Sequence, residues 1–226
     1  MAFAHNAMLR GLNAIYLQAP QIPPADAADF LFFVGSWGDW VLHHHQLEET
    51  MMFPGFEQIP GIRPGQLRDN VEQHLTFSTG LKVLKEYAKD TAQAAYDGSE
   101  IRKIIDSFSG EIRSHLADEI ESLWGLDCCD KGQEGNLLKV YRDSEAEAGK
   151  QDKFVIPPMV LGLCDKTFQG GNDWPVMPIG SAYIVHYLFG RKHRGAWKFL
   201  PSDTFRQPRP LPYLDNDESA KQRMPQ

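Results

Sequence analysis

The segment His45-Gln-Leu-Glu-Glu49 sets an imidazole and a carboxylate four residues apart, and His115-Leu-Ala-Asp-Glu119 repeats this spacing later in the chain. On an α-helix, residues i and i+4 lie one above the other on the same face. Two helices that carry such pairs and face each other would direct two nitrogens and two oxygens toward one interior point. The repeated spacing therefore predicts a helical protein with a metal site, and a dinuclear iron centre suits these ligands.

Apolar residues at helical spacing predict four helices, at about residues 3–19, 26–53, 64–84 and 99–125. The first is expected to stop before Pro20, the second before Pro54, and the third to start at Pro64, since proline suits a first helical turn but no later one. The loops between them are short, which favours antiparallel neighbours. We therefore predict an all-α fold, an up-down antiparallel four-helix bundle, over residues 1–126.

Polar residues interrupt the apolar stripe of every predicted helix. The stripes contain four histidines and two glutamates: His5, His45, Glu49, His74, His115 and Glu119. Burying an unpaired carboxylate costs several kcal/mol or shifts its pKa until it is neutral. Two iron ions would compensate this cost, and bundle interiors are a known location for carboxylate-bridged di-iron sites. Zinc could use the same groups, although it prefers four-coordinate sites rich in Cys or His.

A second pair with the same spacing, His44 and Glu48, lies one residue earlier and is rotated by about 100° around the helix. Periodicity alone does not separate the two registers. We expect His43 and His44 on the surface or hydrogen-bonded behind the metal ligands. Whether His44 or Glu48 joins the metal shell stays open at this point.

Residues 127–226 have a different composition, with nine of the 15 prolines and many aromatic residues. We expect one short helix at residues 179–189 and ordered loop elsewhere, packed as an extension against the bundle. His186 and His193 lack a partner at helical spacing, so structural roles are expected. Cys128, Cys129 and Cys164 have no metal-type spacing and are expected to remain thiols.

Charge and hydropathy exclude several classes of function. The net charge is −7 and the pI about 5.6, which argues against a nucleic-acid partner. No apolar run reaches the roughly 20 residues that cross a bilayer, and the first residues lack the pattern of a secretory signal. We therefore expect a cytoplasmic protein without a membrane partner. The oligomeric state is not indicated.

Several of these residues together resemble the hemerythrin-like, HHE cation-binding family. The match consists of His5, the segment from His45 to Phe53-Pro54, His74, and the segment from His115 to Glu119. The resemblance implies a bundle that binds two iron ions, and the Phe-Pro pair selects His45 and Glu49 as the ligand register. Residues 127–226 resemble an extension of fungal members, especially around His193-Arg-Gly-Ala-Trp197.

The family includes oxygen carriers, sensors of oxygen or nitric oxide, iron-responsive domains and oxidative enzymes. The carriers have a fifth histidine four residues after the third-helix histidine, where this chain has Ser78. This departure implies open coordination positions for O2 or a small-molecule substrate. The first hypothesis is therefore an O2-activating oxygenase or oxidase of a small organic molecule, such as an aromatic compound. The alternatives are a non-enzymatic protein that reversibly binds O2 or NO or senses iron, and a metal-free scaffold.

Overall fold

The computed structural model describes residues 1–126, 136–171 and 174–214, and this part of the chain is helical, with one isolated β-bridge between Ser202 and Pro208. The helices of the first half are α1 (Ala2–Gln18), α2 (Ala27–Leu47), α3 (Phe53–Phe56), α4 (Arg68–Asp90), α5 (Gly98–Asp106) and α6 (Ser109–Trp124). Those of the second half are α7 (Asn136–Ala148), α8 (Ile156–Leu163), α9 (Ser181–Tyr187) and α10 (Arg194–Trp197).

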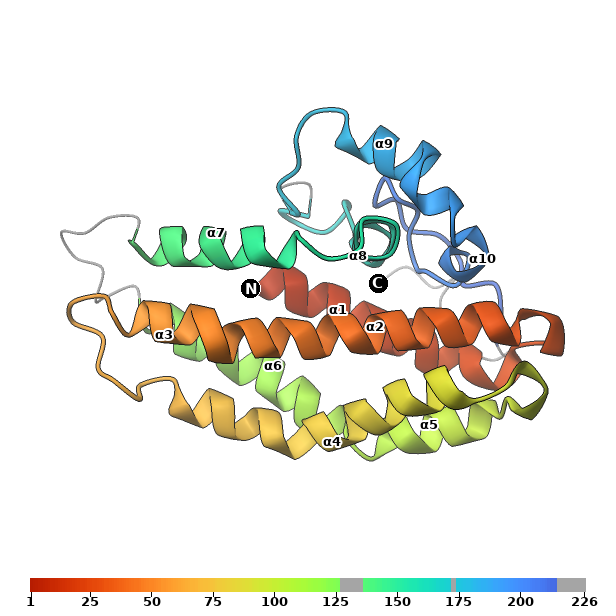
Figure 1. The fold of residues 1–226 in the computed structure, drawn as a ribbon, viewed down its shortest axis with the longest axis horizontal. Coiled ribbons are helices and arrows are strands. Elements are labelled where there is room, and N and C mark those ends of the chain that lie inside the picture. The colour runs from red at the N-terminus through yellow and green to blue at the C-terminus, as the bar shows by residue number, and fades with distance from the viewer. Residues whose placement is uncertain (127–135, 172–173, 215–226) are drawn as a thin grey trace.

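The predicted antiparallel bundle is confirmed. In Figure 1, α1, α2 and α4 alternate in direction, and the run of α5 and α6 returns along them. Helix α4 packs against both α2 and α6, and α1 contacts α2, α5 and α6. The end of α1, the start of α2 and the end of α4 therefore lie at one end of the bundle, and their opposite termini lie at the other.

The fourth helix, which the sequence pattern predicts as continuous, breaks between α5 and α6. Ser107 Oγ donates a hydrogen bond to the Ile104 carbonyl, and Phe108 leaves helical geometry at φ −137°. The buried Phe108 ring lies against the backbone of Gly80 in α4, where an added Cβ would lie 2.8 Å from Phe108 Cβ. The break thus places an aromatic ring in the core.

The second helix runs past its predicted end at Pro54. After α2 the chain forms a π-helix at Glu48–Met52 and then α3, with Pro54 in the first turn of α3. In the π-helix the Phe53 N–H donates to the Glu48 carbonyl, five residues back. The wider turn lets the chain continue through a residue that has no N–H to donate.

The third helix begins at Arg68 and not at Pro64. Gly65 has a positive φ of 76°, a conformation that cannot continue a right-handed helix and that glycine adopts without steric cost. The Gly65 N–H donates to Glu57 Oε1. Residues 64–67 therefore form a turn before the helix, and the proline signal belongs to that turn.

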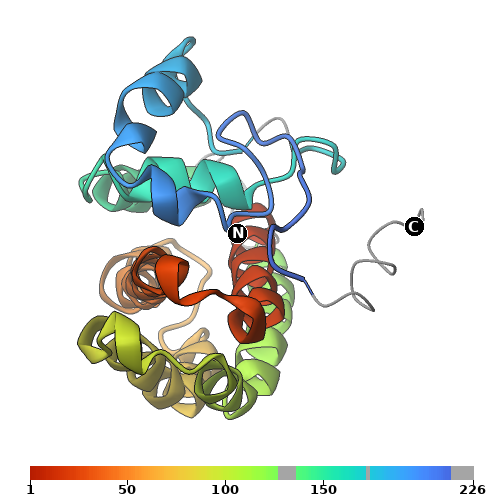
Figure 2. The ribbon, with the colours of Figure 1, turned by 90° about the vertical axis from the view of Figure 1, so that its right-hand side faces the viewer.

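The second half contains more helix than expected. Helices α7 and α8 lie where we expected loop, and α9 covers most of the predicted 179–189 helix. Pro157 and Pro158 stand in the first turn of α8, where proline is tolerated, so a proline-rich composition was misleading. Figure 2 shows this half as a layer over α1 and α2, on the side away from α4 and α5. The proposed division at residue 126 stays a prediction.

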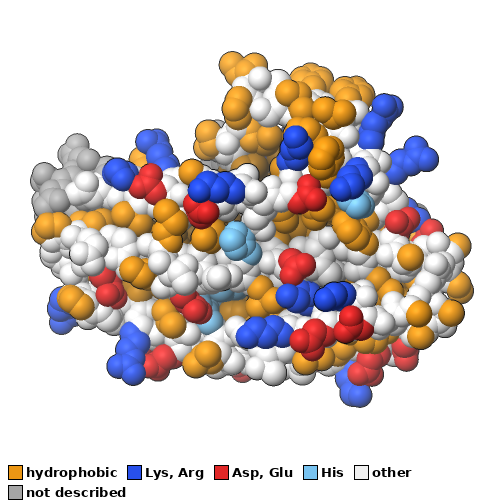
Figure 3. Space-filling view, viewed as in Figure 1, with side chains coloured by type: hydrophobic (Ala, Val, Ile, Leu, Met, Phe, Trp, Pro, Cys, Tyr) orange, Lys and Arg blue, Asp and Glu red, His pale blue; other side chains and the backbone are white. Residues whose placement is uncertain are grey.

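The surface of this layer is uneven in polarity. Hydrophobic side chains gather over α9 at the top of Figure 3, including exposed Tyr183, Ile184 and Tyr187. Cys164 is a buried free thiol, whereas Cys128 and Cys129 lie outside the described residues. Within the described ranges, no helix combines the length and the apolar character that a membrane crossing needs.

Candidate metal centre

Antiparallel packing brings the sequence-predicted histidines to one end of the bundle. His5 lies near the start of α1, His45 at the end of α2, His74 near the start of α4, and His115 in the middle of α6. Each of these four side chains is almost completely buried. The interior at this end is therefore lined by imidazoles contributed by all four helical runs of the bundle.

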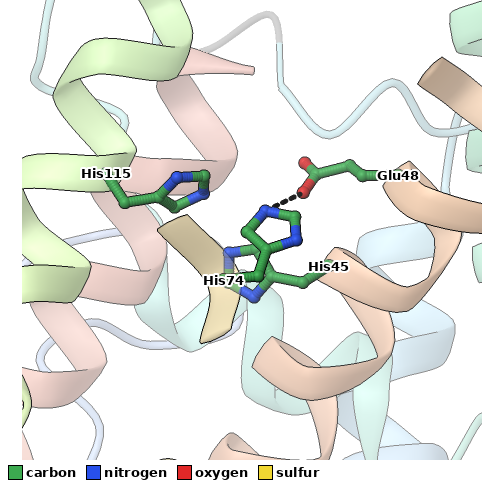
Figure 4. A group of neighbouring side chains, drawn as sticks. All are labelled: His45, Glu48, His74 and His115. Atoms are coloured by element: carbon green, nitrogen blue, oxygen red, sulfur yellow. Dashed lines mark ion pairs between the residues drawn. The ribbon is translucent and has the colours of Figure 1, made fainter. Parts of the chain in front are cut away.

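One group of ligand atoms consists of His45, Glu48, His74 and His115, and one atom from each lies within 4.8 Å of all the others. Figure 4 shows the three rings and the Glu48 carboxylate turned toward a shared space. The ion pair drawn there joins His74 Nε2 and Glu48 Oε2 at 3.5 Å. This geometry could hold a metal ion with nitrogen and oxygen ligands.

A second group shares Glu48 with the first. It consists of His5, His44 and Glu48, and His44 Nε2 lies 2.6 Å from Glu48 Oε1. Glu119 lies between the two groups, because its Oε2 atom is 3.3 Å from His5 Nε2 and 3.6 Å from His115 Nε2. Two carboxylates, Glu48 and Glu119, thus stand where they could bridge two ions.

The structure corrects the expected position of Glu49. Its side chain is 40% exposed and its Oε1 accepts a hydrogen bond from His74 Nδ1 at 2.7 Å, whereas the Glu48 side chain is 2% exposed. The π-helix begins only at Glu48, and His44 still pairs with Glu48 at the i, i+4 spacing, so the packing of α2 against its neighbours selects this alternative register for the buried carboxylate. Glu48 occupies the interior place expected for Glu49, which instead orients a histidine from outside. Metal ligation by any of these residues stays a prediction.

The outer ring nitrogens have fixed protein partners. His5 Nδ1 donates to the Leu116 carbonyl at 2.8 Å, His115 Nδ1 contacts Gln73 Oε1 at 3.0 Å, and His74 Nδ1 contacts Glu49. A backbone carbonyl can only accept, so His5 Nδ1 carries a proton and Nε2 is the ring nitrogen that faces the interior. Metal-bound histidines almost always make such an outer hydrogen bond, which orients the ring and raises its basicity.

The inner atoms lack hydrogen-bond partners. Ten of the 12 buried side-chain nitrogen and oxygen atoms without a hydrogen bond, within the described residues, belong to this cluster: His5 Nε2, His44 Nε2, His45 Nδ1 and Nε2, both oxygens of Glu48, His74 Nε2, His115 Nε2, and both oxygens of Glu119. Buried polar atoms are almost always paired in folded proteins. Their concentration at one point fits a site that metal ions complete.

Burial also sets the protonation of these groups. It lowers the pKa of His45 well below its ordinary value and that of His115 to about 4, so both rings are neutral at neutral pH. Neutral imidazole is the form that binds metals. Burial and the nearby Glu119 raise the pKa of Glu48. Burial also acts to raise the pKa of Glu119, but the contact with His5 and the nearby His44 and His115 together outweigh it, so the pKa of Glu119 is lowered. A bound cation would hold both as carboxylates.

Two residues of the cluster were not selected from sequence, His44 and Glu48. The sequence indicated them only as the alternative pair at i, i+4 spacing. The packing of α2 against its neighbours is what distinguishes this pair from His45 and Glu49. Ser78 does not face the cluster as a ligand, because its hydroxyl donates to the His74 carbonyl. With His44 and His45 both present, five histidines surround the site. Ser78 replaces the third-helix histidine of the oxygen carriers, but His44 brings the number of histidines back to five.

Outside the bundle, His186 Nδ1 contacts Thr204 Oγ1 at 2.7 Å and His193 stacks on Phe32 at 4.2 Å between ring centroids. Neither belongs to a group that could hold a metal among the described residues. Both contacts agree with the structural roles expected for these histidines.

Comparison with known proteins agrees with the site. Residues 1–125 match the hemerythrin HHE cation-binding domain. The chain is also 33% identical over 226 residues to the "Dimeric xanthone biosynthesis cluster protein R11" of Cryptosporiopsis sp. (strain 8999), covering 98% of this chain and 84% of that protein. No solved structure matched the chain. The family implies a metal-binding site, and the buried cluster of His and Glu residues is where the fold could hold it; the chain belongs to the hemerythrin HHE cation-binding domain family.

Proposed function

We propose that this protein is a non-haem di-iron protein that activates O2 and oxidises a small organic molecule, as an oxygenase or oxidase. Iron would supply O2 binding and the redox change. His5 and His44 would hold one ion and His45, His74 and His115 the other, with Glu48 and Glu119 shared between them. The observation that carries the proposal is the set of buried imidazole nitrogens and carboxylate oxygens that meet at this one point without hydrogen bonds.

A cavity beside the cluster supports an enzymatic role. It has a volume of about 330 Å³, within the range of small-molecule sites, and His44 and Glu48 are among the residues that line it. A substrate in this cavity would lie next to the proposed ions. The similar protein is named for a biosynthesis cluster, which also favours a role in making a small molecule.

The chain's own residues would control the site in two ways. The outer hydrogen bonds of His5, His74 and His115 hold the rings in place, so that metal binding needs little rearrangement. Apolar residues around the cluster, including Phe77 at 4.9 Å from the His45 ring, limit the entry of water. An oxidising site with restricted water favours reaction with the bound molecule.

The second candidate is a non-enzymatic protein that reversibly binds O2 or NO or senses iron. The observation that favours it is the fifth histidine at the cluster, since a centre with more protein ligands has fewer open positions for substrate. The two candidates share the same ligands and differ in whether O2 is consumed or released unchanged.

The experiment loads the metal-free protein with iron(II) under anaerobic conditions and records its visible spectrum while O2 is admitted and then removed. A transient band that decays to a diferric product supports O2 activation. A persistent band that disappears on degassing supports the second candidate. If no iron is retained, the di-iron proposal is wrong.

A further inference from the structure

The second half of the chain forms walls of the cavity beside the cluster of histidines and glutamates. The floor of the cavity includes His44 and Glu48, and its walls include α7, the start of α8 and the loop that carries Trp174. In Figure 1, α7 runs along α2 above the end that carries the cluster. The extension thus turns one side of the bundle into a binding site.

The lining is mostly apolar and aromatic. It includes Trp40 from α2, Tyr141 from α7 and Trp174, together with aliphatic and methionine side chains. No Lys or Arg side chain lines it within the described residues. The α-amino group of Met1 also lines the cavity, but it lies near the carboxylates of Glu48, Glu119 and Glu145. These walls therefore favour an uncharged ligand, because an anion would meet carboxylates and no Lys or Arg side chain.

One carboxylate stands among these walls, that of Glu145 on α7. Its Oε1 atom accepts hydrogen bonds from the Tyr141 hydroxyl at 2.7 Å and from Trp174 Nε1 at 3.3 Å. Burial, together with this hydrogen bond, raises the pKa of Tyr141, so its hydroxyl keeps the proton that it donates. Both donors engage the same oxygen, which leaves Oε2 to accept a hydrogen bond from a ligand.

We propose that this cavity binds a neutral aromatic phenol, whose hydroxyl donates to Glu145 Oε2 while its ring lies among Trp40, Tyr141 and Trp174. The ring then extends toward Glu48 and His44. This names a substrate class for the proposed oxygenase and rests on that function only for the chemistry, because binding is measured without turnover. Hydrogen bonding to a partly buried charged group would distinguish a phenol from its methyl ether.

The experiment measures binding of 2-naphthol and 2-methoxynaphthalene to the full chain by isothermal titration calorimetry, with and without iron. The ether has nearly the same ring surface but no hydroxyl proton. We expect 2-naphthol to bind about tenfold more tightly, the ratio that one charge-assisted hydrogen bond supports.

The variant Glu145→Gln tests whether Glu145 Oε2 accepts the hydrogen bond from the phenol hydroxyl. Trp174 Nε1 can only donate, so the amide oxygen must stay toward Trp174 and Tyr141, and the amide NH2 then replaces Oε2. An NH2 group cannot accept from the phenol, so the preference for 2-naphthol should disappear. The matched control is Glu147→Gln on the same helix, where the carboxylate is 43% exposed and pairs with Lys150. It should keep the preference.

Equal affinity for both probes in the unchanged protein, or a preference that survives in Glu145→Gln, would overturn the proposal. Iron content and the response to O2 are measured on the same samples. Selective phenol binding without iron retention would reject the proposed function alone. Normal iron and O2 behaviour without phenol selectivity would reject the cavity proposal alone.

Discussion

The two ends of the bundle have opposite interiors, although the same four helical runs build both. At one end, Phe30, Leu84 and Ile101 are fully buried, and Phe30 packs edge-on to Phe199 of the extension at 5.0 Å between ring centroids. At the other end, the interior contains imidazoles and carboxylates whose inner atoms lack hydrogen bonds. Burial of apolar side chains stabilises the first end, whereas the buried polar atoms at the other end form a cluster that could hold a metal ion.

This difference suggests that fold stability and the candidate metal site depend on opposite ends of the bundle. Leu84 and His74 lie ten residues apart on α4, which is about 15 Å along the helix. At that distance, substitutions at the two ends should act independently on stability. Paired substitutions at the two ends can therefore separate metal binding from the stability of the fold.

Glu48→Ala should remove most of the bound iron, because it deletes a carboxylate shared by both ligand groups. Glu49→Ala, one residue away, should retain most of it, with at most weaker binding of about 10–100-fold from the loss of an outer contact. The measurement is iron per chain after anaerobic loading and desalting. Loss of iron in Glu49→Ala but not in Glu48→Ala would show that Glu49, and not Glu48, is the metal ligand.

Leu84→Ala at the apolar end should lower the free energy of unfolding by about 2–5 kcal/mol, through lost burial and a residual cavity. Iron content of the folded protein should not change. Urea unfolding monitored by circular dichroism, with an iron assay on the same preparation, measures both. A loss of iron would show that the two ends are coupled.

Glu48→Leu should leave the metal-free protein as stable as the unchanged chain, or more stable by about 1–4 kcal/mol, because it removes a carboxyl group buried at high cost. The same variant should not bind iron normally. Urea unfolding of both proteins in the presence of a chelator makes the comparison. Strong destabilisation would mean that the contacts of Glu48 with His44 and His74 suffice without a metal.

Asp26→Asn should have the smallest effect, a loss of about 0.5–1 kcal/mol at pH 7. Asp26 connects the start of α2 to the extension, through Lys198 Nζ at 2.6 Å and the Tyr213 hydroxyl. These two contacts lower the pKa of Asp26 below its ordinary 3.8. The contribution is therefore present above about pH 3.8 and is lost as the pH falls through the lower folded-state pKa.

Urea unfolding at pH 7 and near pH 2 tests this sign, since the difference between the variant and the unchanged chain should vanish in acid. The control is Asp39→Asn, whose carboxylate is 65% exposed beside Lys85 and should contribute less. A difference that grows on acidification would contradict the assignment.

Much of the fold could be predicted because helical periodicity is a local property of the chain. The stripes that contain His5, His74 and His115 placed these residues in the bundle interior, where the structure has them. The break at Ser107 and Phe108 could not be predicted, since it depends on the space beside Gly80 in another helix. Helix α8 was missed because prolines in a first helical turn resemble those of a loop.

The choice between neighbouring glutamates shows the limit most clearly. By itself, the sequence determined that a carboxylate from residues 48–49 would lie on the same helix face as a histidine from residues 44–45, because residues four apart on a helix share a face. The tertiary structure decided that Glu48 lies inside and Glu49 outside, through the packing of α2 against its neighbours. It also decided that Glu145 and Trp174 would meet beside this site, because contacts between residues far apart in sequence arise only when the extension packs on the bundle.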